Sequence, residues 1–184
     1  TLSSLNVAIG HSALKTVSSG NGEHHNVAVG ANAGLSVTTG VQNTLIGGLA
    51  GDAVTTGSYN VIMGTNAGGG VTTGDQNIII GQGTNAAALT GNTNTIIGDS
   101  AGQAMTSAAN NVAVGANTLV AHTTAANCTA VGANALQSNI AGADNTGLGK
   151  GALATNSSGS QNTAVGVRSM EDSTTSSDNT AIGW

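Results

Sequence analysis

Apolar and polar residues along this chain follow a unit that returns every 17 residues. The unit reads asparagine, three mostly apolar residues and glycine, as in the run from Asn162 to Gly166. An apolar run of this length predicts a short β-strand in each unit, because alternate residues of a strand face the same way. Self-similarity at one fixed period predicts a solenoid. We therefore predict an all-β fold, a parallel β-solenoid with one 17-residue repeat per coil.

The fifth position of the unit is always glycine. After Gly10, the series is Gly30, Gly47, Gly64, Gly81, Gly98, Gly115, Gly132, Gly149, Gly166 and Gly183. Such constancy fits a backbone site with positive φ, or one pressed against another backbone, since only glycine has no Cβ. We expect these turn glycines to end each strand.

The first position is asparagine in every repeat except the one that begins at Cys128. After Asn6, the asparagines are Asn26, Asn43, Asn60, Asn77, Asn94, Asn111, Asn145, Asn162 and Asn179. Coils that stack about 4.8 Å apart place these amides above one another, where they can form a hydrogen-bonded structural ladder. Cys128 is expected to interrupt the ladder at one rung as a small buried residue.

Both faces of the predicted strands are apolar. We expect the second and fourth positions, such as Val27 and Val29, to form the face that is buried in the coil. The third position then lies on the opposite face, and a strand with two apolar faces needs cover on both sides. We expect neighbouring chains to supply that cover. The residues predicted at the heart of this interchain contact are Leu45, Ile62, Ile79 and Ile96.

The rest of each repeat predicts a short return path. A small residue followed by Gly or Leu, as at Ala50 and Gly51, predicts a second, shorter strand or a corner, and a Thr-rich turn such as 55–57 follows. The first repeat, residues 6–25, has three extra residues within 18–23, where we predict a bulging turn. We predict one array over residues 1–184, with eleven coils and the last one truncated.

Composition excludes several classes of function. The net charge is −5 and only 6% of residues are charged, so no basic patch is available for nucleic acid. The apolar runs are far shorter than the roughly 20 residues of a membrane-spanning helix. A single cysteine, Cys128, cannot form an intrachain disulfide.

Candidate chemistry is sparse. The histidines His11, His24, His25 and His122 occupy unrelated repeat positions, and no Ser, His and carboxylate grouping stands out. We therefore predict no enzyme activity, no cofactor and no metal site. The run from Glu23 to His25 is the most suggestive metal-binding group, because a three-chain rod would carry it three times. A solvated insertion loop is the favoured interpretation.

The runs 6–10, 26–30 and 179–183 resemble two groups of repeat proteins. One is the head domain of trimeric autotransporter adhesins, with a similar Asn-x-Ala-Ile/Val-Gly core. The other is the repeat array of phage tail fibres, which is more similar because Ala-Gly or Ala-Leu follows the glycine. The resemblance covers essentially the whole chain. It implies a left-handed β-roll built from three copies of the chain, on a virion or cell surface, with receptor or glycan recognition outside these repeats.

The expected function is the structural shaft of a virion tail fibre that displays a host-recognition element. One alternative is the head of a bacterial trimeric surface adhesin, which uses the same rod. Another is an ice-binding β-solenoid that orders water on threonine ladders, namely the pairs at 38–39, 55–56, 72–73, 123–124 and 174–175. This alternative is weakened by lapses at 140–141 and 157–158, and by the ordinary use of threonine in β-rich turns.

Overall fold

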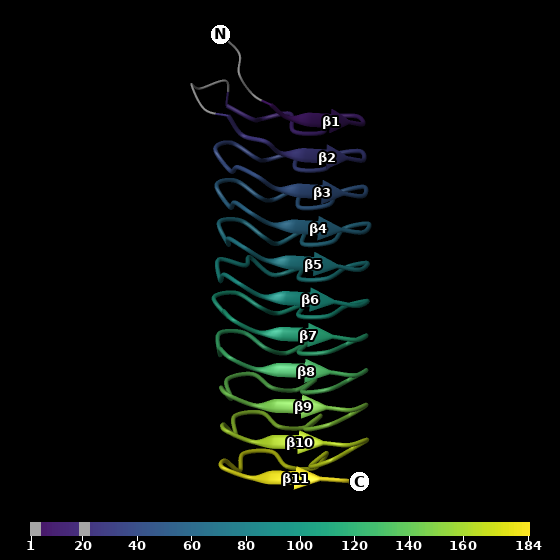
Figure 1. Cartoon of the computed structure of the whole chain (residues 1–184), viewed down its shortest axis with the longest axis vertical. Helices are drawn as coiled ribbons and strands as arrows, with labels where there is room; N and C mark the ends of the chain where they lie inside the picture. Colours follow the sequence, from purple (N-terminus) through teal and green to yellow (C-terminus); the bar gives the residue numbers. More distant parts are fainter. Residues whose placement is uncertain (1–4, 19–22) are drawn as a thin grey trace.

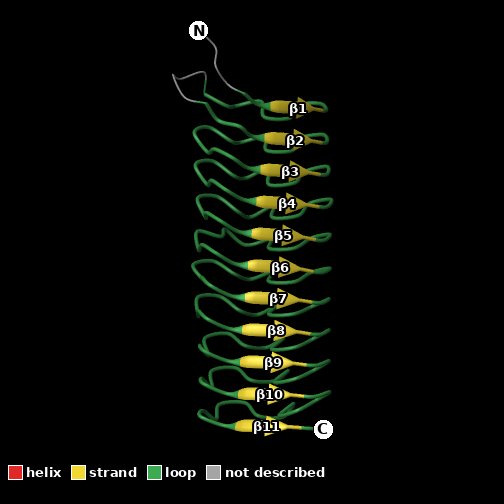
Figure 2. Cartoon of the chain, viewed as in Figure 1, coloured by secondary structure: helices red, strands yellow, loops and turns green. Residues whose placement is uncertain are grey.

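The computed structural model describes residues 5–18 and 23–184, which form a straight stack of coils (Figure 1). Each coil contributes one strand of three residues, and loops and turns make up the rest of the described chain (Figure 2). The strands are β1 Val7–Ile9, β2 Val27–Val29, β3 Thr44–Ile46, β4 Val61–Met63, β5 Ile78–Ile80, β6 Thr95–Ile97, β7 Val112–Val114, β8 Thr129–Val131, β9 Thr146–Leu148, β10 Thr163–Val165 and β11 Thr180–Ile182. The bulging turn predicted within 18–23 falls mainly on residues 19–22, outside the described residues.

The strands form one parallel sheet in chain order. From β2 onward each residue pairs with the residue 17 positions later, as Ile62 does with Ile79 and Ile79 with Ile96. Every position of the repeat therefore forms a column along the rod. The prediction of an all-β parallel solenoid with a 17-residue period is confirmed.

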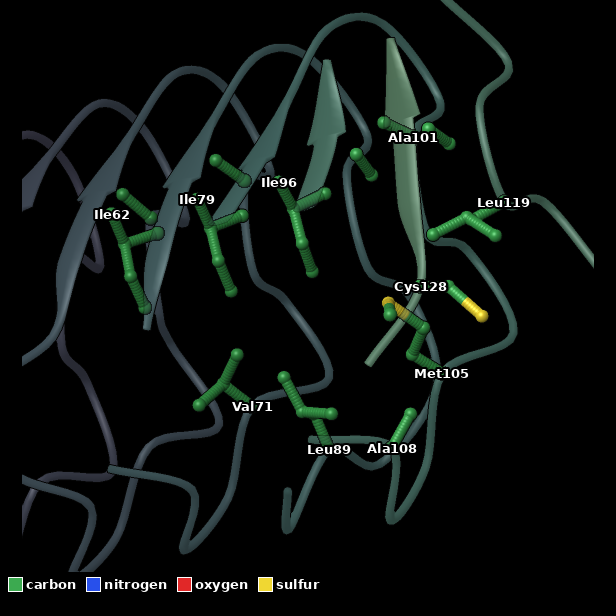
Figure 3. Packing of buried hydrophobic residues seen from close by; sticks show 14 of the residues in the cluster. Ile62, Val71, Ile79, Leu89, Ile96, Ala101, Met105, Ala108, Leu119 and Cys128 are labelled. Carbon is green, nitrogen blue, oxygen red and sulfur yellow. The ribbon is translucent and has the colours of Figure 1, made fainter. Parts of the chain in front are cut away.

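The two faces of the sheet are the reverse of the sequence prediction. In β2 to β10 the middle residue is buried and the two flanking residues are at least partly exposed. Leu45, Ile62, Ile79 and Ile96 are fully buried within the single chain. Ile62, Ile79 and Ile96 point into the coil, toward Val71 and Leu89 on the opposite wall (Figure 3). The interchain contact predicted for these four residues is therefore wrong, because another chain cannot reach them.

The physical reason for this reversal lies in the opposite wall of the coil. A strand of three residues offers either its middle side chain or its two flanking ones to the interior. After the turn glycine the chain makes two tight turns, closed by bonds from Ala50 N to Gly47 O (3.2 Å) and from Val54 N to Gly51 O (3.1 Å). The region predicted as a second strand or a corner is thus a corner. This corner forms the wall opposite the strand, and the space between the two holds one side chain from each strand.

Side chains of complementary size fill the interior. In three repeats a large middle-strand residue, Leu45, Ile62 or Ile96, faces a glycine at the ninth position: a Cβ on Gly51 would lie 2.9 Å from Leu45 Cδ2. In the C-terminal half the sizes are exchanged, so that Ala113, Ala130 and Gly147 share their repeats with Leu119, Leu136 and Leu153. Interiors pack to a nearly constant density, so this exchange preserves the fold while moving the bulk from the sheet to the corner.

The turn glycines stack backbone on backbone. Those from Gly30 to Gly166 have φ between 125° and 139°, which residues with side chains rarely adopt. A Cβ on Gly81 would also lie 2.6 Å from the carbonyl oxygen of Gly98 in the next coil. Any residue with a side chain would therefore be strained by the positive φ and would also clash with the next coil, so only glycine fits at these positions.

Candidate functional site

The described residues contain no pocket and no group of three or more His, Cys, Asp and Glu side chains placed to hold a metal. They also contain no helix able to cross a membrane. Of the suggestive run, His25 Nε2 lies 3.2 Å from Glu23 Oε2, whereas His24 is almost completely buried. The regular polar contacts of the described residues lie in columns that run along the rod, each formed by one position of the repeat.

The asparagine ladder is the most regular of these columns. The Oδ1 atom of Asn26 accepts a bond from the backbone N–H of Asn43 (2.9 Å) and a second bond from Asn43 Nδ2 (3.1 Å). The Nδ2 group of Asn43 also donates to the carbonyl oxygen of Gly57 (2.9 Å), near the end of the same coil. Each amide therefore joins two coils and also closes its own coil.

The amides are buried but keep their hydrogen bonds. Asn26, Asn43, Asn60, Asn77, Asn94, Asn111, Asn145 and Asn162 are at most 1% exposed. Leaving a buried polar group without a partner costs about 1–3 kcal/mol, so the ladder avoids a large cumulative penalty. It also fixes the register of the coils, since a shift of one residue would replace each amide by another residue.

Cys128 changes the ladder at one rung. Its backbone N–H still donates to Asn111 Oδ1 (2.8 Å), and its Sγ lies 3.2 Å from the carbonyl oxygen of Gly142. In the next coil Asn145 Nδ2 retains its bond to Gly159 O (2.7 Å), but its backbone N–H faces sulfur instead of an amide oxygen. The ladder is therefore weaker at this rung. Burial raises the pKa of the Cys128 thiol, which keeps it protonated.

A second column turns from apolar to polar along the rod. At the twelfth repeat position, residues such as Val37 and Val54 give way to His122, Asn139 and Asn156, all fully buried. His122 Nε2 lies 2.8 Å from the carbonyl oxygen of Ala125. A carbonyl oxygen only accepts, so Nε2 carries the proton of the neutral ring and Nδ1 is an acceptor.

The side-chain hydrogen bonds between coils in this column all run in one direction, from each residue to the one 17 positions before it. Asn139 Nδ2 donates to His122 Nδ1 (3.1 Å), and Asn156 Nδ2 donates to Asn139 Oδ1 (3.1 Å). Both amides also donate to carbonyl oxygens of their own coils, those of Gly142 (2.8 Å) and Gly159 (2.9 Å). Burial lowers the pKa of His122, so the ring is held neutral. We call His122, Asn139 and Asn156 the polar interior column.

The polar interior column brings together residue types that occur in nucleophilic catalysis. Asn139 Nδ2 lies 3.7 Å from Cys128 Sγ as well as contacting His122. A reactive cysteine needs a lowered pKa and access for a substrate. Cys128 is fully buried and its pKa is raised. The arrangement is therefore suited to holding coils together, not to attacking a substrate.

The threonine pairs form a third column at the turn. The first hydroxyl of a pair donates to the backbone of the next coil, as Thr38 Oγ1 does to Thr55 O (3.1 Å) and Thr55 Oγ1 to Thr72 O (3.1 Å). Thr72, Thr106, Thr123 and Ser157 repeat this bond. These hydroxyl protons are used in bonds between neighbouring coils, while the second residue of each threonine pair, such as Thr56, is exposed.

Two further columns lie on the outward side of the sheet, and we call them together the outer face. It consists of the second and fourth repeat positions of every strand. The fourth positions are Ile9, Val29, Ile46, Met63, Ile80, Ile97, Val114, Val131, Leu148, Val165 and Ile182, and the second positions are Val7, Val27, Thr44, Val61, Ile78, Thr95, Val112, Thr129, Thr146, Thr163 and Thr180. These side chains are partly or fully exposed.

Stacked coils, one strand per coil and ladders at fixed positions define the chain as a β-solenoid of the repeat-protein class. Comparisons with protein-family models, with curated proteins and with solved structures found no match.

The 17-residue spacing predicts the asparagine and glycine columns, whereas the polar interior column is not predicted. His122, Asn139 and Asn156 are spaced 17 residues apart, which is the same signal that marked the asparagines. The signal is harder to notice because only three repeats share the polar type. Leu119, Leu136 and Leu153 follow the same spacing and lie in the segment that the sequence predicts as a second, shorter strand or a corner.

Proposed function

We propose that this chain is a structural shaft segment of a virion tail fibre, which holds a host-recognition element away from the particle. The observation that carries the proposal is the continuous coil-to-coil bonding. Neighbouring coils are joined through the sheet, through the asparagine ladder and through the threonine column. Eleven strands stacked about 4.8 Å apart give a rod of roughly 50 Å.

The proposed mechanism is mechanical. In a solenoid each repeat contacts only its neighbours, so its stability is nearly a sum of repeat and interface terms. Bending the rod requires strained bonds in several columns at once, which makes the stack stiff. Its length follows from the number of coils, so repeat number sets how far a recognition element stands from the particle. Receptor or glycan binding is proposed for regions outside this sequence.

We place the proposed shaft on a virion or cell surface as a homotrimer, in line with the sequence resemblance. The head of a bacterial trimeric surface adhesin is the second candidate. It rests on the motif that adhesin heads share with tail fibres, which lies on the strands themselves, as at β2 Val27–Val29 between Asn26 and Gly30. Ice binding by the threonine pairs is less favoured, because the first hydroxyls of four of the five pairs, those of Thr38, Thr55, Thr72 and Thr123, donate to the backbone of the next coil.

Labelling with an antibody tests the proposed function. We expect an antibody raised against the purified chain to decorate the tail fibres of virions induced from cells that carry the gene. Decoration of the bacterial surface in cells without virions would instead support the adhesin head and contradict the tail fibre. Thermal hysteresis of a solution of the purified chain would support ice binding.

A further inference from the structure

The outer face carries one unbroken aliphatic column along the rod, beside a column of β-branched residues. Its fourth-position column is aliphatic in every one of the eleven strands, and its second-position column holds only Val, Ile and Thr. Exposure is substantial even in the middle of the stack: Ile78 is 41% exposed and Leu148 is 45% exposed. Single exposed apolar residues are ordinary, but a continuous stripe of this kind marks an interaction surface.

The outer face is also free of charge. The chain has eleven charged residues, three basic and eight acidic, and none occupies the second, third or fourth position of a repeat. They are Lys15, Glu23, Asp52, Asp75, Asp99, Asp144, Lys150, Arg168, Glu171, Asp172 and Asp178. A partner that covers this face therefore removes no ionised group from water, which is the largest penalty in most interfaces.

The size of the outer face fits an assembly of several copies. A stripe roughly 50 Å long and about 10 Å wide presents about 500 Å² per chain, so two chains bury about 1,000 Å² when they pack. That value lies at the lower bound for a specific interface, and three chains that share their stripes around a common axis bury about 1,500 Å² in total.

The period of the stripe favours another copy of this chain as the occupant. Side chains along each column repeat once per coil, as in the pairing of Met63 with Ile80 and of Ile80 with Ile97. Only a surface with the same rung spacing interdigitates with these rows along their full length, as in the dry interfaces between stacked sheets. Another copy of this chain has that spacing by construction. We propose that the outer face packs against the outer faces of further copies, sheet toward sheet, in a side-by-side bundle.

This inference rests on the proposed shaft function for the number of copies, which is three. It replaces the middle-strand residues with the outer face as the site of interchain contact. Rods related by a rotation axis along their length place each rung against the same rung of the neighbour. The Val, Ile and Thr side chains of the interface then meet in register.

The test uses lysine pairs and the molar mass of the full chain in solution. Wild type is expected at three times the 17.5 kDa chain mass by sedimentation equilibrium. Ile80→Lys combined with Val114→Lys puts charge on the outer face and is expected to give the single-chain mass. Thr73→Lys combined with Ser107→Lys adds the same charge at exposed turn positions and is the matched control, expected to remain assembled.

A milder pair keeps the test decisive if the lysine variant does not fold. Ile80→Thr with Val114→Thr retains β-branched residues already used in the neighbouring column, and it is expected to raise the dissociation concentration at least about tenfold. A wild-type chain of monomer mass, or an assembly that both outer-face pairs leave intact, overturns the proposed interface. Antibody decoration of tail fibres is independent of these masses, so failure of the interface and failure of the shaft function are distinguishable.

Discussion

The buried asparagine amide is the residue on which stacking of the coils most depends. Asn77 Oδ1 accepts bonds from the backbone N–H of Asn94 (2.9 Å) and from Asn94 Nδ2 (3.0 Å), and Asn77 Nδ2 donates to Gly91 O (3.1 Å). Asn77→Ala leaves these groups buried without their partner. We expect the free energy of unfolding to fall by about 3 kcal/mol, measured by urea denaturation.

Thr56→Ala is a suitable control for the loss of a side chain. Thr56 is exposed, and its substitution is expected to change the free energy of unfolding by less than about 0.5 kcal/mol. Equal effects of the two substitutions would contradict the structural role given to the ladder.

Substitution of Cys128 by asparagine tests the ladder in the opposite way, because it restores the missing amide at this rung. Gly159 O accepts from both Asn145 Nδ2 (2.7 Å) and Asn156 Nδ2 (2.9 Å). The equivalent Gly142 O, which already accepts from Asn139, therefore has room for a second amide. Cys128→Asn also returns an oxygen acceptor to the Asn145 N–H. We predict an increase of about 1 kcal/mol in the free energy of unfolding; a decrease would show that this rung requires the smaller side chain.

His122 makes stability depend on pH. Burial lowers its pKa in the folded chain below the ordinary value of 6.5, so the unfolded chain binds the proton first as pH falls. The contribution of His122 is fully present above pH 6.5 and decreases as pH falls from there toward the folded pKa. Protonation would also place a donor on Nδ1 against the Asn139 Nδ2 donor.

His122→Val isolates this contribution, because valine already occupies the same column at Val37 and Val54. Thermal denaturation across pH should show a smaller loss of stability below pH 6.5 in the variant than in wild type. Parallel pH profiles would mean that the fall in stability comes from other groups.

At the scale of the element, the coil interior is a matched pair of walls. Leu119→Gly alone leaves a cavity and is expected to cost about 2–5 kcal/mol, and Ala113→Ile alone overpacks the same repeat by about 1–3 kcal/mol. Together they recreate the arrangement of Ile96 with Gly102, so the double variant should lie close to wild type. The double-mutant cycle measures this coupling; additive losses would show that the two walls do not exchange volume.

The two walls of the coil also explain which features of the fold can be predicted from the sequence and which cannot. The strands, period, asparagines and turn glycines were predicted because each repeats at 17 residues with little change. The face of the strand that points into the coil was predicted wrongly, because three successive residues such as Val61, Ile62 and Met63 are all apolar and the pattern does not distinguish the two faces. The opposing corner decides between the faces, and its effect is visible only when sizes are compared between columns, as for Ile62 and Gly68.

In the whole molecule, the length of the rod is a direct consequence of the number of coils. The sheet continues in the same order through all eleven strands, without a change of register after β2. The exchange of bulk between the walls near Ala113 and the ladder interruption at Cys128 both occur inside this continuous sheet. Side-chain composition therefore varies along the rod while the coil geometry remains constant.

Small-angle scattering on chains with deleted coils tests this central claim most directly. Removing residues 60–76, one complete repeat, should shorten the particle by about 4.8 Å and leave a cooperative unfolding transition, and removing 60–93 should shorten it by about twice that amount. Removing residues 60–69 breaks the register and should disrupt the fold. Equal lengths for the one-repeat and two-repeat deletions, or loss of folding after removal of a whole repeat, would contradict the account.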